Sequence, residues 1–469
     1  MSAFPFWIAG KPVHGGETTT IRSSYDNSVA GAHHAPDDAE VEAAVQAAHD
    51  VRAEAARTPA HVRAAALDHV SRKLTERAEE FARLITAESA KPIKWSRGEV
   101  ARAASTFRWA AEEARRFTGE LQRLDTDPGG TGRMALVRRV PKGPVLGITP
   151  FNFPLNLVAH KVAPAIAVGA PIVLKPAPAT PLTALLLGEL LAETTLPAGS
   201  WSILPTGNDV AARLVTDPRL PVVSFTGSVP VGWSIRESAP RKHVALELGG
   251  NAAAIVCPDW TDLAFAAQRI ATFAMYQAGQ SCISVQRVYA HAGVFDELVD
   301  KVTAAVAALG VGDPNDDTTD VGPLINTAAA ERVESWVREA GGEVTRDGAT
   351  LSPVVLTNVA EDAKVLADEV FGPVVTLNRV DSVDEAFDRV NNSRFGLQTG
   401  VFTRDLPTAF EASARLDVGG VVIGDVPSFR ADQMPYGGVK DSGVGREGPA
   451  SAMLDFTEER VTVLTGLPL

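Results

Sequence analysis

The feature that most constrains the fold of this chain is an alternation of short apolar segments with helical segments, which begins at Gly143. The apolar segments are rich in β-branched residues and fall at residues 145–149, 171–176, 221–227 and 243–250. Strands that alternate with helices form a mainly parallel sheet covered on both faces. The pattern resumes further along the chain, and we predict a second α/β domain over residues 251–440.

Two parts of the chain lie outside this alternation. Residues 37–118 are rich in good helix formers and predict three helical runs, the second over 61–89 and the third over 97–117. Turn residues between extended stretches predict a hairpin over 119–140, and the tail DFTEERVTVL ends in an isolated strand. Because unpaired strands need an edge, and another subunit is one way to supply it, we expect an oligomer.

Composition and charge exclude several classes of protein. The 469 residues are enough for two or three domains. No stretch approaches the roughly 20 apolar residues of a membrane span, and the N-terminus lacks the pattern of a secretory signal. The net charge of −13 argues against nucleic acid or an acidic membrane as partner. Two cysteines without zinc-like spacing fit a reducing compartment, so we expect a cytoplasmic protein without a metal.

A glycine turn, GSVPVG at residues 227–232, connects the strand PVVSF to a helix. Free backbone N–H groups and the positive end of a helix dipole suit a pyrophosphate at such a turn. The pattern is not the G-x-G-x-x-G fingerprint. Taken alone, it fits an ordinary strand-to-helix turn better.

Each of the two cysteines has two interpretations. Cys282, in QAGQSCISV, stands between a helix and a strand, where a partly open and electropositive pocket would make it a nucleophile. A single cysteine is more often a small buried apolar residue. For Cys257, which follows an apolar strand, we keep the packing interpretation.

Three further polar residues stand at or near the ends of strands. Glu247 fits either a general base with room to move or a surface glutamate at a turn. Asn152 fits an amide donor to an oxyanion or a turn residue between two prolines. Lys175 fits a cation that binds ribose or phosphate, or a solvated surface lysine.

Taken together, these segments resemble the aldehyde dehydrogenase superfamily. The resemblance extends over nearly the whole chain, with eight motifs in the family's order, which makes a chance match very rare. The motifs are PFNFPLN (150–156), VLKPAPATP (173–181), FTGSVPVG (225–232), LELGGN (246–251), GQSC (279–282), EVFGPVV (369–375), NNSRFGLQTGVFT (391–403) and PYGGVKDSGVGREG (435–448).

The resemblance implies a fold of three parts. They are a Rossmann-like cofactor domain over 1–118 and 141–250, a second α/β catalytic domain over 251–440, and a small β oligomerisation element over 119–140 and 449–469. Dimers and tetramers are usual for the family, so we expect a homodimer or a homotetramer.

The resemblance also implies roles for the candidate catalytic residues. The Cys282 thiolate attacks the aldehyde carbon, and the Asn152 amide and the Cys282 backbone N–H hold the resulting oxyanion. Hydride passes to the nicotinamide and leaves a thioester. Glu247 then activates the water that hydrolyses this thioester.

NAD or NADP is the cofactor that the resemblance implies. Glu369 and Phe371 resemble the residues that hold the nicotinamide ribose and ring, and Ser228 resembles the pyrophosphate contact. The implied cofactor contacts are Thr149, Pro150, Phe151, Lys175, Pro178, Gly227, Ser228, Glu369 and Phe371.

Pro178 departs from the pattern of many NAD-specific members, which carry a glutamate at this position. That glutamate accepts hydrogen bonds from the ribose hydroxyls and repels a 2′-phosphate. Because the repulsion is absent here, we expect NADP+ to be tolerated. A comparison of kcat/KM for the two cofactors checks this, and a preference for NAD+ of at least about a hundredfold, about 2.7 kcal/mol, would contradict it.

Aligned on the family, the aldehyde pocket takes residues from several segments, namely Arg102, Phe153, Leu157, His160, Ser281 and Arg430. Other members carry bulky apolar residues at the positions of Arg102 and Arg430. Two guanidinium groups there suit a carboxylate, sulfonate or phosphate tail. The alternative is an exposed helix residue and a charge at the rim. Ser281, where some anion-binding members have arginine, argues against a doubly charged tail.

The segment PSFRADQMPYGGVKDSGVGREG is similar to that of members which handle lactaldehyde, sulfolactaldehyde and phosphonoacetaldehyde. We therefore predict NAD(P)+-dependent oxidation of a small aldehyde with an anionic or hydroxylated tail. Two alternatives stay open. A CoA-acylating dehydrogenase commonly lacks the glutamate that matches Glu247, and a catalytically silent relative would have lost the nucleophile or the base.

Overall fold

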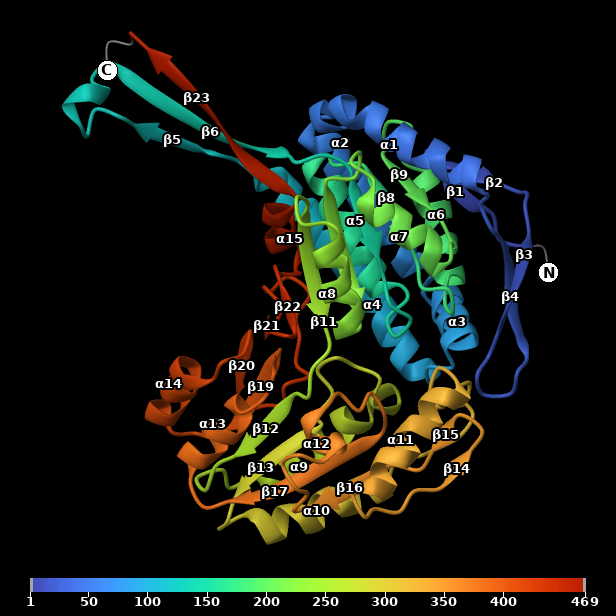
Figure 1. Cartoon of the computed structure of the whole chain (residues 1–469), viewed down its shortest axis with the longest axis vertical. Coiled ribbons are helices and arrows are strands. Elements are labelled where there is room, and N and C mark those ends of the chain that lie inside the picture. The colour runs from blue at the N-terminus through green and yellow to red at the C-terminus, as the bar shows by residue number, and fades with distance from the viewer. Residues whose placement is uncertain (1–2, 467–469) are drawn as a thin grey trace.

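The larger sheet is built from the apolar segments that alternate with helices in the first half of the chain (Figure 1). In the computed structural model, which describes residues 3–466, its eight strands run in the order β2-β1-β9-β8-β7-β10-β11-β22. The central five are parallel, as predicted. The strands are β1 (Phe6–Ile8), β2 (Lys11–Val13), β7 (Val145–Ile148), β8 (Ile172–Lys175), β9 (Trp201–Ile203), β10 (Val222–Gly227), β11 (His243–Leu248) and β22 (Gly443–Val444).

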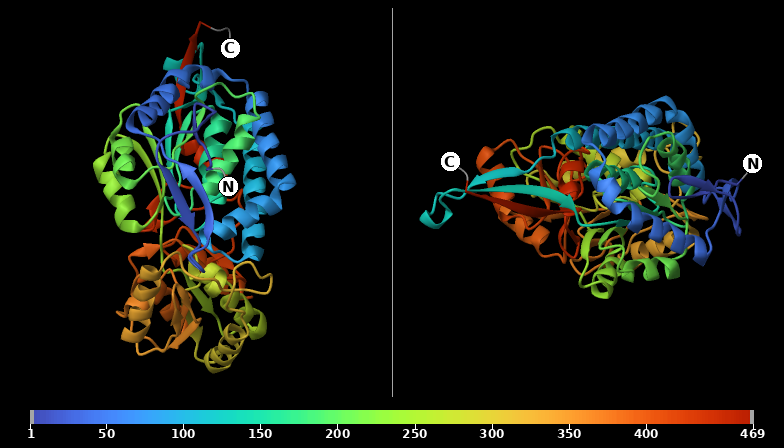
Figure 2. Two further views of the ribbon diagram at one scale, coloured as in Figure 1. Left: turned by 90° about the vertical axis from the view of Figure 1, so that its right-hand side faces the viewer. Right: turned by 90° about the horizontal axis from the view of Figure 1, so that it is seen from above.

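Helices cover both faces of this sheet, with α2 and α4 on one side and α7 and α8 on the other (Figure 2). Every residue of α5 is buried, so this helix lies at the centre of the first half. The helices are α1 (Asp38–Arg57), α2 (Ala60–Glu76), α3 (Ala78–Ser89), α4 (Ile93–Arg116), α5 (Asn156–Val168), α6 (Leu182–Ala192), α7 (Asn208–Thr216) and α8 (Val229–Ser238).

The helical region 37–118 holds four helices, whereas the sequence predicts three. The run expected over 61–89 divides at Arg77, whose backbone (φ −102°, ψ 23°) leaves helical geometry between α2 and α3. The third run begins at Ile93, ahead of the expected residue 97, with Pro92 at its N-cap. A proline is tolerated there because its missing N–H has no helical partner at a helix start.

The second sheet has six strands in the order β16-β17-β13-β12-β19-β20, and every neighbouring pair is parallel. The strands are β12 (Ala253–Val256), β13 (Arg287–His291), β16 (Val354–Thr357), β17 (Val374–Val380), β19 (Gln398–Phe402) and β20 (Gly420–Ile423). The helices that accompany it are α9 (Leu263–Met275), α10 (Phe295–Ala307), α11 (Thr327–Glu339), α12 (Lys364–Ala367), α13 (Val383–Asn391) and α14 (Leu406–Arg415). The α/β fold class is confirmed.

Short hairpins and pairs complete the two halves. They are β3 (Thr18–Arg22) with β4 (Val29–His34), β14 (Arg346–Asp347) with β15 (Thr350–Leu351), and β18 (Phe395–Gly396) with β21 (Val439–Lys440). After β21 the chain returns to the larger sheet, where β22 pairs with β11 and α15 (Pro449–Asp455) packs against α5. The segment between β20 and α15 therefore joins the two sheets and borders the space between them.

A three-stranded antiparallel sheet projects from the body of the molecule (Figure 1). It contains β5 (Glu120–Arg123), β6 (Arg133–Pro141) and β23 (Thr457–Thr465), in the order β23-β6-β5. The sequence suggested an isolated tail strand. In the structure this strand is paired, because β6 of the same chain supplies its edge. Residues 1–2 and 467–469 of the predicted domains lie outside the described residues. Across residues 3–466, no helix combines the length and apolar character that a membrane crossing requires.

Candidate active site

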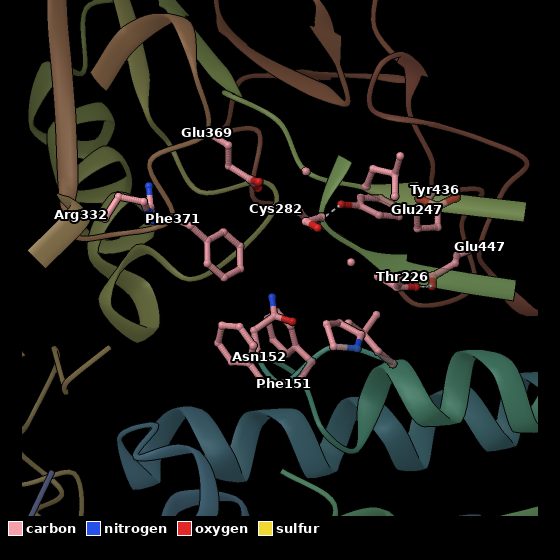
Figure 3. A pocket seen from close by; sticks show the side chains of 17 residues that line it. Phe151, Asn152, Thr226, Glu247, Cys282, Arg332, Glu369, Phe371, Tyr436 and Glu447 are labelled. Carbon is pink, nitrogen blue, oxygen red and sulfur yellow. Dashed lines mark hydrogen bonds between the residues drawn. The ribbon is translucent and has the colours of Figure 1, made fainter. Parts of the chain in front are cut away.

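Residues from both halves of the chain line one cavity of about 300 Å³ (Figure 3). The cavity lies at the carboxyl ends of β10 and β11, the edge where α/β sheets bind ligands. It brings together the three predicted catalytic residues. Two of them, Asn152 and Cys282, are more than 100 positions apart in the sequence. The lining residues are Pro150, Phe151, Asn152, Phe153, Leu157, Thr226, Gly227, Ser228, Glu247, Leu248, Gly249, Cys282, Arg332, Glu369, Phe371, Tyr436 and Glu447.

Cys282 follows a short turn of unusual backbone geometry, η2 (Tyr276–Gly279). Gln277, Ala278 and Gly279 have φ values of 42°, 58° and 71°, a run of left-handed residues that is costly for non-glycine residues. At Gly279 a Cβ atom would lie 1.9 Å from the carbonyl oxygen of Gly372, so only glycine fits there. This turn fixes the direction in which the next residues leave the helix and brings the thiol to the cavity.

The thiol of Cys282 is partly buried, and its Sγ lies 2.9 Å from the hydroxyl of Tyr436. Burial raises the pKa of Cys282 to about 12, and the bond from Tyr436 and the charge of Arg430 act in the opposite direction. A buried thiol gives up its proton reluctantly. The geometry therefore calls for groups that favour the thiolate, and Tyr436 is the one in contact with the sulfur.

Asn152 presents its side-chain amide to the segment before the nucleophile. Its Nδ2 donates to the backbone carbonyl of Gln280 over 2.9 Å, and Gln277 Nε2 donates to the same carbonyl over 2.7 Å. Two donors on one acceptor tie the amide to the turn that carries Cys282. A primary amide has two N–H groups, so one of those on Asn152 remains available for an oxyanion.

Glu99 fixes the start of the helix that follows Asn152. This fully buried carboxylate accepts from the backbone N–H groups of Leu155 (2.8 Å) and Asn156 (3.1 Å) at the beginning of α5. Its other oxygen pairs with the ammonium group of Lys91. A carboxylate at a helix N-terminus is favoured by the free N–H groups and the helix dipole. The position of Asn152 is therefore set by packing from α4 as well as by its own loop.

Glu247 is the penultimate residue of β11 and is 5% exposed. Neither carboxylate oxygen has a hydrogen-bond partner among the described residues. Burial, and then the charge of Glu447, raise the pKa of Glu247 well above its ordinary value. At Gly437 a Cβ atom would lie 2.8 Å from Glu247 Oε1, so this glycine leaves the carboxyl room. A buried, unpaired carboxyl of raised pKa is suited to general-base work.

Glu369 and Phe371 lie on the opposite wall of the cavity (Figure 3). Burial raises the pKa of Glu369 to about 7, and the carboxyl accepts from the backbone N–H of Gly250 over 3.3 Å. At Gly249 a Cβ atom would lie 2.0 Å from Glu369 Oε2, so a side chain here would displace the carboxyl of Glu369. Phe371 (φ 48°) meets the ring of Phe151 edge-on at 5.9 Å. The Glu369 carboxyl and the Phe371 ring thus form this wall of the cavity, and Gly249 leaves room for the carboxyl.

The other predicted cofactor residues lie nearby or further along the same sheet edge. Gly227 and Ser228 line the cavity, and Ser228 stands at the N-cap of α8 without using its side chain as a cap. Lys175, at the end of β8, is 3% exposed, and burial lowers its pKa to about 8. Thr149 and the exposed Pro178 do not line the cavity. No carboxylate stands at 178 to repel a 2′-phosphate.

Arg102 already has a partner. Its Nη2 and Nε donate to Asp432 over 2.8 and 3.3 Å, and Asp432 also contacts His160 Nε2 at 3.1 Å. Burial alone would raise the pKa of Asp432, but His160 and Arg102 hold it below its ordinary value. Burial, and then the charge of Arg430, lower the pKa of His160, so its ring is neutral at pH 7. Of the predicted substrate residues, Phe153 and Leu157 line the cavity, whereas Arg102, His160, Ser281 and Arg430 are not among the cavity-lining residues.

Arg430 is buried between the same histidine and Glu447. Its Nη2 lies 3.0 Å from Glu447 Oε2 and 3.1 Å from His160 Nε2, and its Nε has no partner among the described residues. Lys161 approaches Glu447 from the other side at 3.6 Å. Burial would raise the pKa of Glu447, but Arg430 and Lys161 lower it to about 2. We call this row the charge chain: Arg102, Asp432, His160, Arg430, Glu447 and Lys161.

We compared the sequence and the structure with those of known proteins. The model of the aldehyde dehydrogenase family matches residues 12–462. The chain belongs to the aldehyde dehydrogenase family. As a member it is an oxidoreductase that acts on aldehydes, and NAD or NADP is its cofactor, as the motifs predicted. The expected family, activity and cofactor are confirmed.

Individual relatives cover most of this aldehyde dehydrogenase. It is 46% identical over 401 residues to the 3-sulfolactaldehyde dehydrogenase of Priestia aryabhattai, which covers 83% of each chain. Its structure matches aldehyde dehydrogenase 21 of Physcomitrella patens, solved with the reaction product succinate, with a TM-score of 0.97, 43% identity and 99% of each chain covered. It also matches the NADP-dependent glyceraldehyde-3-phosphate dehydrogenase of Bacillus halodurans C-125, solved with NADP, with a TM-score of 0.95, 36% identity and 99% and 100% of the two chains covered.

The sequence analysis did not single out five polar residues that the structure places in or beside the cavity. They are Lys161, Thr226, Arg332, Tyr436 and Glu447. Tyr436 and Glu447 fall inside the motif PYGGVKDSGVGREG, and Thr226 falls inside FTGSVPVG, so the motifs contained them without showing their direction. Lys161 follows His160 on α5, and a lysine in so apolar a helix was a visible signal of a buried charge.

Proposed function

We propose that this aldehyde dehydrogenase oxidises a small aldehyde with one negative charge on its tail to the carboxylate, through a thioester on Cys282. The observation that carries the proposal is the convergence on one cavity of a thiol, an amide with a free N–H, and a carboxyl without a partner. They belong to Cys282, Asn152 and Glu247. These groups match the needs of acyl transfer through a covalent intermediate.

Cys282 and Asn152 act in the first half of the reaction. The sulfur of Cys282 forms a bond to the carbonyl carbon, and the electron pair of the carbonyl π bond moves to oxygen. The free N–H of Asn152 donates to this oxyanion, while its other N–H stays on the Gln280 carbonyl. One donor of this kind contributes about 3–4 kcal/mol to the transition state.

The cavity also fits the dinucleotide that the family uses. Gly227, Ser228 and Gly249 line it at the strand ends, and Lys175 is a buried cation with no ion pair among the described residues. Glu369 and Phe371 would hold the nicotinamide end, and Ser228 and Lys175 the pyrophosphate and adenosine ends. When bound, the nicotinamide supplies the acceptor for the hydride that leaves the substrate carbon. Glu247 then takes a proton from water, whose oxygen attacks the thioester carbon and displaces the thiolate.

The charge chain supports a substrate with a single negative charge. Arg102, Arg430 and Lys161 are basic, Asp432 and Glu447 are acidic, and His160 is neutral, so the row has one more basic than acidic group. Burial lowers the pKa of Lys161, and the charges of Glu447 and Glu247 oppose this effect. The unpartnered Nε of Arg430 and the partly exposed Arg102 are the groups with donors to spare. One anionic tail would complete this balance, whereas two separate free arginines would have suited a dianion.

The relatives support the same class of substrate. The names of the similar proteins include a sulfonate-bearing aldehyde, 3-sulfolactaldehyde, and a dicarboxylate product, succinate. Both have an acidic group at the end opposite the reacting carbon. A phosphate-bearing aldehyde also occurs among them, glyceraldehyde-3-phosphate, but its tail carries two charges. We infer that a sulfonate or carboxylate tail fits this chain better.

The Arg102→Leu variant tests the anion site. We expect KM for a monoanionic aldehyde such as succinate semialdehyde to rise at least about tenfold, because a charge-assisted hydrogen bond contributes about 1.5–3 kcal/mol and Asp432 stays behind as a repelling charge. KM for propanal should change less than about threefold, within the range of surface substitutions. Steady-state kinetics with both aldehydes provide the measurement.

The matched control for that experiment is Arg108→Leu, which removes an exposed guanidinium from the same helix. It should leave KM for both aldehydes unchanged. If Arg102→Leu weakened the neutral and the anionic aldehyde equally, the residue would support the fold of the pocket and would not recognise the tail.

We also infer that the projecting sheet joins subunits, as a dimer or a tetramer. Its outer strands β23 and β5 each keep one edge without a strand partner among residues 3–466, and Leu121, Val461 and Val463 are more than half exposed. An exposed apolar strand edge is a surface that proteins usually cover. Sedimentation equilibrium should give a mass two or four times that of one chain, and a monomer would exclude this assembly.

A further inference from the structure

Tyr436 is held beside the nucleophile by contacts on three sides. It is 4% exposed, and its backbone N–H and C=O exchange hydrogen bonds with Glu447 over 3.0 and 2.6 Å. The guanidinium of Arg430 lies 4.0 Å from the centre of its ring. Figure 3 shows the hydroxyl directed at the sulfur of Cys282, 2.9 Å away. The ring has little freedom to turn elsewhere.

Among the hydrogen bonds of residues 3–466, the sulfur of Cys282 is the one partner of the Tyr436 hydroxyl. A buried phenol normally uses its O–H, because an unsatisfied buried donor costs free energy. Burial also raises the pKa of Tyr436 well above its ordinary value, so the phenol keeps its proton. Toward a thiolate, which can only accept, the phenol is therefore always the donor.

We propose that the Tyr436 hydroxyl is a further catalytic group, which donates a hydrogen bond to the Cys282 thiolate and holds it ready for the aldehyde. The proposal rests on the function proposed above, since it needs Cys282 as nucleophile. Arg430 contributes from behind, because a cation over the face of the ring draws electron density from the phenol and makes its O–H a better donor.

The step is balanced without any other reagent. The thiol proton leaves to a water molecule in the cavity, and the phenol keeps its own proton and turns it toward the sulfur. When sulfur bonds to the carbonyl carbon, its charge passes to the carbonyl oxygen, which accepts a hydrogen bond from the Asn152 amide. The hydrogen bond from Tyr436 then loses most of its strength, because the sulfur has become a neutral thioether.

Other charged groups surround the thiol, and their effects do not replace that of Tyr436. Burial is the largest influence and opposes the thiolate, and Tyr436 is the strongest influence in its favour. Arg430 also favours the thiolate, whereas Glu369 and Glu447 oppose it, and Glu247 faces Tyr436 itself. Removal of the hydroxyl alone should therefore have a measurable effect on the acidity of the thiol.

The test is the rate of alkylation of the enzyme by iodoacetamide as a function of pH, in the absence of aldehyde and cofactor. In Tyr436→Phe we expect the midpoint of the profile to move up by about one pH unit, which is a tenfold slower reaction at any pH below it. Incorporation of 3-fluorotyrosine at 436, a more acidic phenol and a stronger donor, should move the midpoint down. The two variants keep the ring and differ in the direction of the shift.

Two controls isolate the hydroxyl and the sulfur. Tyr289→Phe removes a buried phenol oxygen from β13, which has no bond to Cys282 and does not line the cavity, and should keep the parent profile. Cys282→Ser gives the background rate from the buried Cys257. Thermal unfolding of each variant identifies any loss of fold.

The outcomes separate the two proposals. A Tyr436→Phe enzyme that alkylates with the parent profile would overturn the role of the hydroxyl, and the proposed function would stand. If in addition its KM for an anionic aldehyde rose, the hydroxyl would bind substrate and not the thiolate. If Cys282→Ser kept its oxidising activity, the proposed function itself would fail, whatever the alkylation profile showed.

Discussion

The Cys282→Ser variant should oxidise aldehydes at least about 10⁴-fold more slowly than the parent enzyme, because loss of the nucleophile removes the covalent route. A serine hydroxyl at this position would need to lose a proton of much higher pKa than the thiol, and burial already disfavours the charged form of the side chain. The cavity, the amide of Asn152 and the cofactor wall stay in place. The measurement is kcat/KM from NAD(P)H formation at saturating cofactor.

The second cysteine supplies the control for that result. Cys257 lies at the end of β12, is 1% exposed, and has a pKa raised to about 12 by burial and by Asp259. It is packed with apolar residues of the second half and does not line the cavity. Cys257→Ala should keep kcat/KM within a few fold of the parent. Substantial activity in Cys282→Ser would remove the basis for every step proposed above.

The Glu247→Gln variant should stop the reaction half-way. Glutamine keeps the size of the side chain but cannot take a proton from water, so thioester hydrolysis slows while hydride transfer continues. We expect one equivalent of NAD(P)H per active site in a rapid burst, followed by turnover about 10²–10⁴-fold slower than in the parent, the usual range for a general base. Rapid-mixing absorbance at 340 nm records both phases in one trace.

The pH dependence of the parent enzyme follows from the same carboxyl. The raised pKa of Glu247 means that its basic form increases as the pH rises above the ordinary range of a carboxyl. The slow phase should therefore accelerate with pH in the parent and lose this dependence in Glu247→Gln. The exposed Glu237 on α8 offers a matched control, since Glu237→Gln removes one charge without entering the cavity.

CoA distinguishes this enzyme from the acylating alternative. In the parent, release of the acyl group should need no CoA, because Glu247 activates water. If the parent released product only with CoA present, hydrolysis would not be its reaction. If Glu247→Gln showed neither a burst nor turnover, this residue would act before the thioester forms, and the assignment of its role would be wrong.

Asn152 and Glu247 lie after or at the carboxyl ends of β7 and β11, which meet at one edge of the sheet, whereas Cys282 and Phe371 come before β13 and β17. Their roles were expected from the resemblance of the motifs to the aldehyde dehydrogenase family, and the structure brings all four to one cavity. The pairing of Arg102 with Asp432 could not, since 330 residues separate them and no local pattern links α4 to that loop. The same holds for the tail strand, whose partner β6 lies more than 300 positions earlier.

The balance of charges beside the pocket also could not be predicted from the sequence. The sequence places Arg102 and Arg430 in the pocket by alignment, where two guanidinium groups suit a carboxylate, sulfonate or phosphate tail. The structure adds Asp432 and Glu447 between them, which changes the sum of charges beside the pocket. A side chain's formal charge can be read from one letter, whereas its compensation depends on neighbours from other segments.

The backbone contact between Gly279 and Gly372 links the two chemical halves of the cavity. Gly279 belongs to the turn that carries the thiol, and Gly372 follows Phe371 on the cofactor wall, and any Cβ at Gly279 would meet the Gly372 carbonyl at 1.9 Å. With no side chain between them to absorb a displacement, a shift of one strip of main chain must push the other. Redesign of this enzyme for a bulkier dinucleotide analogue would therefore misalign sulfur and substrate unless both loops were remodelled as a unit.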